Sequence, residues 1–373
     1  MVGLQISFWF QVGAAGGQKL EAWKQSQDQL RQNSEEFLAS EEYKRAVILD
    51  QDVVRNPRGA ITPHVTRDGH IALLFYNNGH TERVGYTGRL LVWLTMGRVE
   101  EGEVRWSQPE VAVWWDGVQL DGREDWNEDW AIVDGAGYHD IQELPSGGLA
   151  FVESNKLTVR YHEIEAGLVH GLKCQLDKDC RVPEQIPFKD MVVELEGGGV
   201  ARAPVLPDLR AGGGFTIACW IHLDKLQSSP EERIIVNGKT MASDALDEPA
   251  SGDILKGYQI SLGKDDLLQL QVTDGFSSEF TFPLVGLQDF YAGESGPTMI
   301  AFILDGGPRI ASCVINQRLY NAAPCGWRFL PKDFGEIGGS NVEVVEEGVV
   351  ERLLVFDTAL TTSQAIQLHR YYQ

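Results

Sequence analysis

Residues 135–164 read GAGYHDIQELPSGGLAFVESNKLTVRYHEI, and this stretch decides the fold of the first half of the chain. Apolar and polar residues alternate in its last two runs, LAFVE and LTVRYHEI, which is the period of a β-strand with one buried face. Between the first two runs, Pro145, Ser146, Gly147 and Gly148 supply the residues that tight turns need. The stretch therefore predicts a meander of antiparallel strands.

The same pattern occurs twice further upstream. Residues 56–79 alternate on both sides of Asp68-Gly69, and residues 88–117 do so on both sides of Glu101-Gly102. Both dipeptides are typical of hairpin turns. Hairpins that recur about every 40 to 45 residues with glycine and aromatic signals are typical of propeller blades. We therefore expect blades of a β-propeller over residues 55–164.

The second half of the chain carries a different strand pattern. Residues 191–360 hold many short alternating runs separated by glycine-rich turns, the pattern of a β-sandwich. Thr361-Thr362-Ser363-Gln364 is a predicted N-cap, followed by the short helix SQAIQLHRYY. The fold class predicted is all-β, and the predicted domains are a partial propeller with an N-terminal helix, a linker and a jelly-roll sandwich, over residues 1–170, 171–190 and 191–373.

Residues 18–45 interrupt the strand pattern. Leucine, tryptophan and phenylalanine recur there near helical spacing among Gln, Glu and Lys. An apolar stripe of this kind usually packs against a core, so we interpret the segment as a packing helix.

The charge of the chain excludes several kinds of partner. The 373 residues carry a formal net charge of -22, so a nucleic-acid backbone and an anionic membrane surface are both poor partners. No apolar run is long enough to cross a bilayer. The N-terminal VGLQISFWFQVGAAG fits a core strand better than a signal peptide, because it lacks a basic region before the apolar run.

The five cysteines leave the cellular location open. Cys174 with Cys180 and Cys313 with Cys325 form two local pairs, and Cys219 lies alone in an apolar run. Two disulfides suit a secreted protein, whereas five free thiols suit a cytosolic one. We expect Cys219 to be buried and unpaired, and we favour a secreted or extracellular location.

Two stretches of the chain resemble known families. The first half resembles the last catalytic blade of the sialidase (neuraminidase) superfamily, where a Tyr-x-Asp opens one strand and a Glu closes the next. The matching residues are Tyr138, Asp140, Gly147 and Glu153, and the segments NPRGAITP, LLFYNNG and GEVRWSQPE extend the likeness. The second half resembles the concanavalin A-like, laminin G-like jelly roll through FTIACWIHL, AFILDGG with VINQRL, and ERLLVFDTALTTSQAIQL. That fold hosts lectins, adhesion modules and spacers, so it names no ligand.

The sialidase resemblance implies roles for particular residues. Sialidases are retaining glycosidases with a tyrosine nucleophile. The resemblance places Tyr138 as the nucleophile, Arg89 among the arginines that hold the sugar carboxylate, and Glu153 as the acid that orients an arginine. Asp140 and Arg58 are the further expected substrate contacts. Tyr138 equally fits an aromatic between blades, Arg89 a solvated turn residue, and Glu153 a surface acid at a strand end.

The chain is too short for a whole propeller of this type. Six blades need on the order of 250 residues, whereas about 165 residues precede the second domain. We therefore expect a fragment of a longer chain, with the missing blades upstream or on a partner.

Two functions remain open from the sequence. The first is a sialidase-like glycoside hydrolase with an accessory carbohydrate-binding jelly roll, and the second is a non-catalytic carbohydrate-binding or adhesion protein. Either would have a glycan as its partner. We predict no cofactor, except that an acidic loop could hold calcium through its oxygen ligands, namely Asp121, Glu124, Asp125, Glu128 and Asp129.

Overall fold

The computed structural model describes most of the chain after residue 61. The predicted helix over 18–45, Arg58, Cys325 and the acidic loop lie outside the described residues. The described ranges are 62–76, 89–116, 138–154, 159–180, 184, 186–226, 231–241, 255–275, 279–287, 296–320, 327–331, 334–337 and 341–373.

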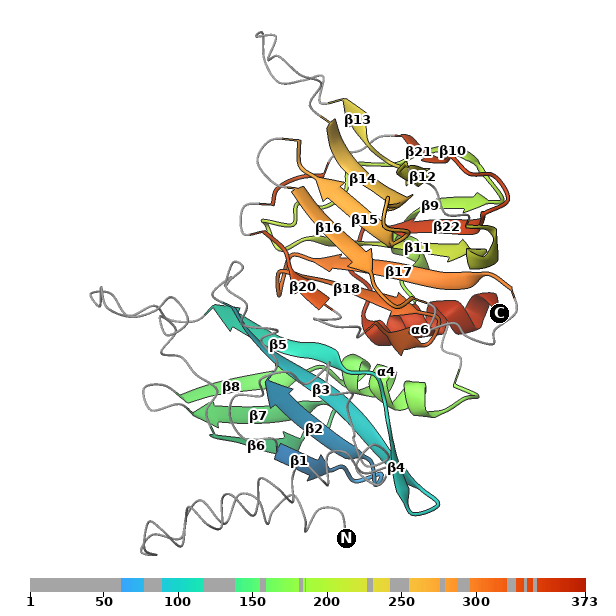
Figure 1. The fold of residues 1–373 in the computed structure, drawn as a ribbon. Helices are drawn as coiled ribbons and strands as arrows, with labels where there is room; N and C mark the ends of the chain where they lie inside the picture. The colour runs from blue at the N-terminus through green and yellow to red at the C-terminus, as the bar shows by residue number, and fades with distance from the viewer. Residues whose placement is uncertain are drawn as a thin grey trace, which may run out of the picture. The chain divides into compact units, whose positions relative to one another are not determined.

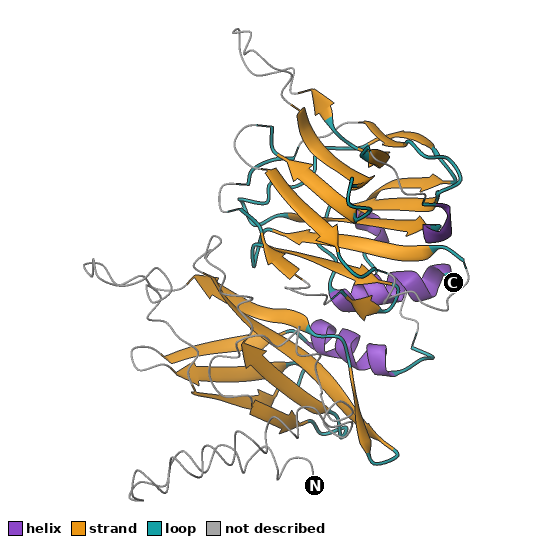
Figure 2. Cartoon of the chain, in the orientation of Figure 1, coloured by secondary structure: helices purple, strands orange, loops and turns teal. Residues whose placement is uncertain are grey.

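The fold is all-β, as the sequence predicts (Figures 1 and 2). Every strand pairing among the described residues is antiparallel. Among the described helices, none combines the length and apolar composition that crossing a bilayer requires.

Two sheets form from the first half of the chain. The five-stranded sheet has the order β1-β2-β3-β4, with β5 pairing β3, and the three-stranded sheet has the order β6-β7-β8. The strands of the first are β1 (Thr62–Val65), β2 (Ile71–Tyr76), β3 (Arg89–Glu100), β4 (Glu103–Trp106) and β5 (Glu110–Asp116). Those of the second are β6 (Tyr138–Glu143), β7 (Leu149–Ser154) and β8 (Val159–Ile164).

The three turns expected from the sequence are confirmed. Gly69 has φ 85° between β1 and β2, Glu101 and Gly102 have φ 49° and 88° between β3 and β4, and Gly147 has φ 86° between β6 and β7. These left-handed conformations are the ones for which glycine is selected. Membership of a propeller stays a prediction for both sheets.

Helix α4 (Ala166–Leu176) follows β8 and was not predicted from the sequence. It begins before the predicted linker over 171–190 and extends into it. Val169, Leu172 and Leu176 are buried in one cluster with apolar residues of both sheets. The spacing of three and four residues places these side chains on one helix face, and this packing stabilises a segment with few local helix signals.

Two seven-stranded sheets form from the second half of the chain. The first has the order β10-β21-β12-β14-β15-β16, with β13 pairing β14, and the second has the order β19-β18-β17-β11-β22-β9, with β20 pairing β18. The strands of the first sheet are β10 (Gly199–Arg202), β12 (Arg233–Asn237), β13 (Thr240–Met241), β14 (Leu255–Leu262), β15 (Leu268–Thr273), β16 (Glu279–Leu284) and β21 (Asn341–Val344). Those of the second are β9 (Met191–Glu196), β11 (Gly214–Ile221), β17 (Thr298–Asp305), β18 (Ile310–Ile315), β19 (Arg318–Leu319), β20 (Trp327–Phe329) and β22 (Val350–Phe356).

The two seven-stranded sheets share one apolar core, so this half is a β-sandwich. Ile260 of β14 and Leu270 of β15 meet Phe215 of β11 and Phe302 of β17 in that core. One-turn 3-10 helices lie at Phe188–Asp190 and Leu223–Lys225. The core residues of β14 and β15 are all even-numbered, so the odd-numbered residues belong to the face turned away from the core.

Helix α6 (Thr362–Tyr372) closes the chain where the sequence predicts a helix. The Thr361 side chain accepts from Gln364 N at 3.1 Å, and the Gln364 side chain accepts from Thr361 N at 2.8 Å, which is a capping box. At the same helix start, the buried carboxylate of Glu110 accepts hydrogen bonds from the backbone N–H and the hydroxyl of Ser363. Burial raises the pKa of Glu110 to about 7, and the bonds from Ser363 oppose that rise.

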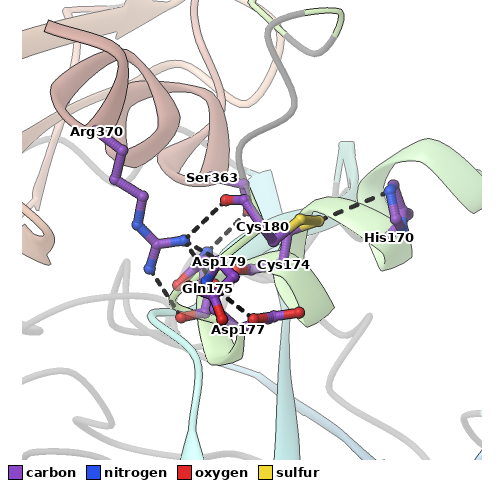
Figure 3. Close-up of a disulfide and its surroundings, with 8 residues drawn as sticks. All are labelled: His170, Cys174, Gln175, Asp177, Asp179, Cys180, Ser363 and Arg370. Carbon is purple, nitrogen blue, oxygen red and sulfur yellow. Dashed lines mark hydrogen bonds between the residues drawn. A yellow bond between two sulfur atoms is a disulfide. The ribbon is translucent and has the colours of Figure 1, made fainter.

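The cysteines agree with the prediction in part. Cys174 and Cys180 form a disulfide at the end of α4 (Figure 3). The Arg370 guanidinium donates to the carbonyls of Cys174 and Gln175, both at 3.0 Å. Cys219 is buried and free, as expected, and burial raises the pKa of its thiol. Cys313 is also buried and free, whereas the sequence left open whether it pairs with Cys325.

Candidate functional site

The residues predicted as a catalytic site lie on two different sheets. Arg89 is the first residue of β3, where it pairs with Asp116 in the five-stranded sheet. Tyr138 and Asp140 lie on β6, and Glu153 lies on β7, in the three-stranded sheet. Arg89 therefore lies in a different sheet from Tyr138, Asp140 and Glu153.

Asp140 and Glu153 belong to opposite faces of the three-stranded sheet. Asp140 pairs with Val152, and both are exposed. Glu153 is the next residue of β7 and is fully buried. The interpretation of Glu153 as a surface acid is therefore wrong, because the period of the strand turns its side chain inward.

Glu153 forms an ion pair with an arginine of the neighbouring strand. Arg160 Nη1 lies 2.6 Å from Glu153 Oε1, and the two residues are direct partners across β7 and β8. The Arg160 guanidinium also lies 5.2 Å from the ring centroid of Trp115 on β5. A buried carboxylate needs such a partner, so this arginine stabilises both the carboxylate and the contact with the other sheet.

His162 belongs to the same cluster, which we call the Glu153 cluster: Phe151, Glu153, Arg160, His162 and Trp115. Its ring stacks on Trp115 at 5.1 Å and on Phe151 at 4.7 Å, both with an interplanar angle of 23°. Burial lowers the pKa of His162, and Glu153 opposes that shift. Burial therefore favours the neutral imidazole, which suits a side chain that packs between two aromatic rings.

A second cluster of polar side chains lies on the sandwich, on the face of β14 and β15 turned away from the core. Gln259 pairs with Gln271 and Ser261 pairs with Gln269 across these strands. Glu232, just before β12, completes the group. We call these five residues the polar platform.

Glu232 is the centre of the polar platform. Its Oε1 accepts from Ser261 Oγ at 2.6 Å and from Gln271 Nε2 at 2.9 Å. It also accepts from Gln259 Nε2 at 3.1 Å and from Gln269 Nε2 at 3.4 Å. Gln259 and Ser261 are buried, whereas Glu232 is exposed. Four donors thus hold one exposed carboxylate in a fixed position.

Lys239 reaches the polar platform from the segment after β12. Its Nζ donates to Gln271 Oε1 at 3.2 Å, and Gln259 Nε2 donates to the same oxygen at 2.9 Å. Burial lowers the pKa of Lys239, while Glu279 and Glu232 raise it. The ammonium is therefore half-buried and engaged with the network.

A hollow opens beside the polar platform. Its volume is ≈ 330 Å³, and it is lined by Glu232, Gln269 and the turn residues Gly263, Lys264 and Asp265. Asp265 Oδ1 accepts from Leu267 N at 3.3 Å, which fixes the turn between β14 and β15. A fixed carboxylate and amide row beside a hollow can bind a small hydroxyl-rich ligand.

The sequence carries only a weak signal for the polar platform, the alternation of polar and apolar residues in two strands. Gln259 and Ser261 in GYQISLG, and Gln269 and Gln271 in LLQLQVTDG, alternate with core residues. Polar residues at these positions fit any solvated strand face, so the pattern alone does not indicate a site. Glu232 could not be found this way, because only the fold brings it over β14.

Among the described residues, no group of three or more His, Cys, Asp or Glu is placed to hold a metal ion. The loop predicted as a calcium candidate lies outside them.

Comparisons with known proteins give no family for this chain. No family model and no curated protein sequence matches. Among solved structures, the receptor-binding domain of botulinum neurotoxin mosaic serotype C/D is similar with a TM-score of 0.32 and 10% identity, over 49% of this chain and 51% of that one. The chain therefore spans about half of that domain.

Two further structures are similar at the same level. The Ruminococcus gnavus IT-sialidase CBM40 bound to alpha2,6 sialyllactose has a TM-score of 0.29 and 15% identity, over 48% of this chain and 99% of that one. The botulinum neurotoxin serotype D ligand binding domain in complex with N-acetylneuraminic acid has a TM-score of 0.31 and 10% identity, over 48% and 41%. Likenesses this weak carry no argument about the fold or ligand of this chain.

Proposed function

We propose that this protein binds carbohydrate through the polar platform of its sandwich and acts as a binding or adhesion protein. The observation that carries the proposal is the Glu232 carboxylate, exposed and held by four side-chain donors next to a hollow.

Sugar rings present hydroxyl groups in fixed pairs along one edge. Planar amide and carboxylate groups match them well, because each can bond two hydroxyls at once. Gln269 and Gln271 are two residues apart on one strand face, and Gln259 and Ser261 face them from the next strand. The outcome is a flat row of polar groups, which requires little reordering when a sugar binds.

The same groups have no role in the core. Their neighbours on β14 and β15, such as Ile260 and Leu270, fill the core between the two sheets. Sandwiches of this kind include lectin domains, although the fold alone does not give a function. The argument therefore rests on the polar platform.

The test is binding of the full chain to a glycan array, followed by calorimetry on the best ligand. Gln271→Ala removes one central amide and should weaken binding at least about tenfold, because a buried or bound polar partner is lost. The matched control is Gln142→Ala, an exposed glutamine on β6. Equal effects of the two variants, or an array without any bound glycan, would overturn the proposal.

A sialidase-like hydrolase is the second candidate. It is favoured by one observation, the arginine held by Glu153, because the resemblance assigns Glu153 the role of orienting an arginine. Its test is release of the fluorophore from a fluorogenic sialoside. Tyr138→Phe removes the nucleophilic oxygen and should lower turnover by orders of magnitude while leaving folding unchanged. Arg89→Lys should mainly raise KM, because lysine loses the bidentate fork. A Tyr138→Phe variant as active as the parent would eliminate this candidate.

A further inference from the structure

We infer that the polar platform selects neutral, hydroxyl-rich sugars and rejects sugars that carry a carboxylate, sulfate or phosphate. This inference rests on the proposed function and adds the ligand class. It follows from which hydrogen-bonding groups the polar platform leaves for a ligand.

The donors of the polar platform are largely used within it. Gln259 Nε2 donates to Glu232 and to Gln271, so both of its protons are engaged. Gln269 Nε2 donates to Glu232 and to Ser261 Oγ, each at 3.4 Å. The Ser261 hydroxyl donates to Glu232. What faces a ligand is therefore rich in acceptors, and a ligand that supplies hydroxyl donors fits best.

The charges beside the hollow also favour neutral sugars. Glu232 and Asp265 line it together with a single lysine, Lys264. Lys239 is half-buried and bonded to Gln271. An acidic sugar would bring a third carboxylate against two, in a chain of net charge -22. Like charges at this range weaken binding, and neutral sugars escape that cost.

The arginine nearest in sequence to the platform does not reverse this balance. Arg233 follows Glu232 directly, and its Nε donates to Glu346 Oε1 at 2.8 Å. Arginine is the side chain best suited to hold a carboxylate bidentately. With this fork engaged by Glu346, the polar platform has the acceptors of a hydroxyl-binding site.

The experiment compares matched pairs of neutral and sialylated or sulfated oligosaccharides by calorimetry with the full chain. The neutral member should bind at least about tenfold more tightly than the acidic one. Raising the salt concentration should reduce this difference in affinity, because salt screens the repulsion between the acidic sugar and the carboxylates of the site. Glu232→Gln should weaken binding of the neutral ligand about tenfold and also reduce the difference in affinity between neutral and acidic ligands. Glu347→Gln, an exposed glutamate in the turn between β21 and β22, is the control and should change neither value.

The outcomes separate this inference from the function on which it rests. If acidic members bind as tightly as neutral ones, or more tightly, and Gln271→Ala weakens them, the polar platform binds glycans but the selectivity is wrong. If neutral members bind and Gln271→Ala has no effect, the platform is not the site and both statements fall. A neutral preference that Glu232→Gln leaves unchanged also overturns the inference.

Discussion

The Glu153 cluster and the polar platform both centre on a glutamate, but the two glutamates differ in burial and in partners. Glu153 is fully buried and paired with Arg160, whose guanidinium lies over Trp115. Glu232 is exposed and held by neutral donors on the face away from the core. The first arrangement joins two sheets, and the second presents polar atoms to solvent. A carboxylate whose position is fixed without being needed for packing is the better candidate for binding.

The largest expected effect is a loss of stability when the ion pair of the buried glutamate, Glu153, is broken. Arg160→Met keeps the apolar stem but leaves the Glu153 carboxylate buried without this partner, so the free energy of unfolding should fall by about 3–5 kcal/mol. Arg98→Met breaks a half-exposed pair with Glu100 and should cost at most about 1 kcal/mol. Chemical denaturation measures both. Similar costs for the two variants would show that the Arg160–Glu153 ion pair does not stabilise the fold.

Glu110 shows what a buried glutamate does when serine groups are its partners. Its pKa is about 7 in the folded protein against an ordinary value of 4.5. The folded state therefore binds the proton more tightly, and its stability should fall as pH rises from about 4.5 to 7, by about 3 kcal/mol. Glu110→Gln does not titrate and should remove this part of the pH dependence.

The measurement is the free energy of unfolding of both proteins across that pH range, with Glu347→Gln as the control. Parallel profiles for the parent and Glu110→Gln would contradict the burial of a titrating carboxyl at the start of α6.

Reduction of the Cys174–Cys180 disulfide should have a smaller effect. The closed loop is short, since the two residues are 6 apart, and chain entropy gives about 2 kcal/mol. Reduction should lower the free energy of unfolding by that amount and leave glycan binding unchanged, because the polar platform is built from other residues. Thermal unfolding with and without reductant measures the change in stability, and calorimetry measures glycan binding. A loss of glycan binding on reduction would mean that the end of α4 contributes to the site.

Local sequence patterns predict the strands and turns of this fold. Helix α4 and the burial of Glu153 depend on contacts between residues far apart in the sequence. The alternation in LAFVE and the turns at Gly69, Gly102 and Gly147 could be predicted, because they depend on neighbouring residues. Helix α4 could not, since its apolar face is explained only by the sheets against which it packs. The ion pair of Glu153 with Arg160 and the burial of Glu153 depend on the pairing of β7 and β8 and on the packing around them, which the local sequence pattern does not show.

Candidate site residues were harder to predict for the same reason. Arg89 and Tyr138 were joined by a resemblance, and the structure places them in separate sheets. The polar platform depends on Glu232 lying across β14 and β15, a contact between residues 27 to 39 positions apart. Sequence alternation can indicate an outward strand face, but not which side chain covers it.

The most direct test of the account is hydrogen–deuterium exchange of the full chain with and without the neutral oligosaccharide that binds best. Bound sugar should slow exchange in peptides covering residues 255–273, which hold four of the five residues of the polar platform and the adjoining turn. Peptides covering residues 138–164, which hold the three-stranded sheet, should exchange at the same rate in both states. Protection confined to residues 138–164 would contradict the account and assign the function to the three-stranded sheet.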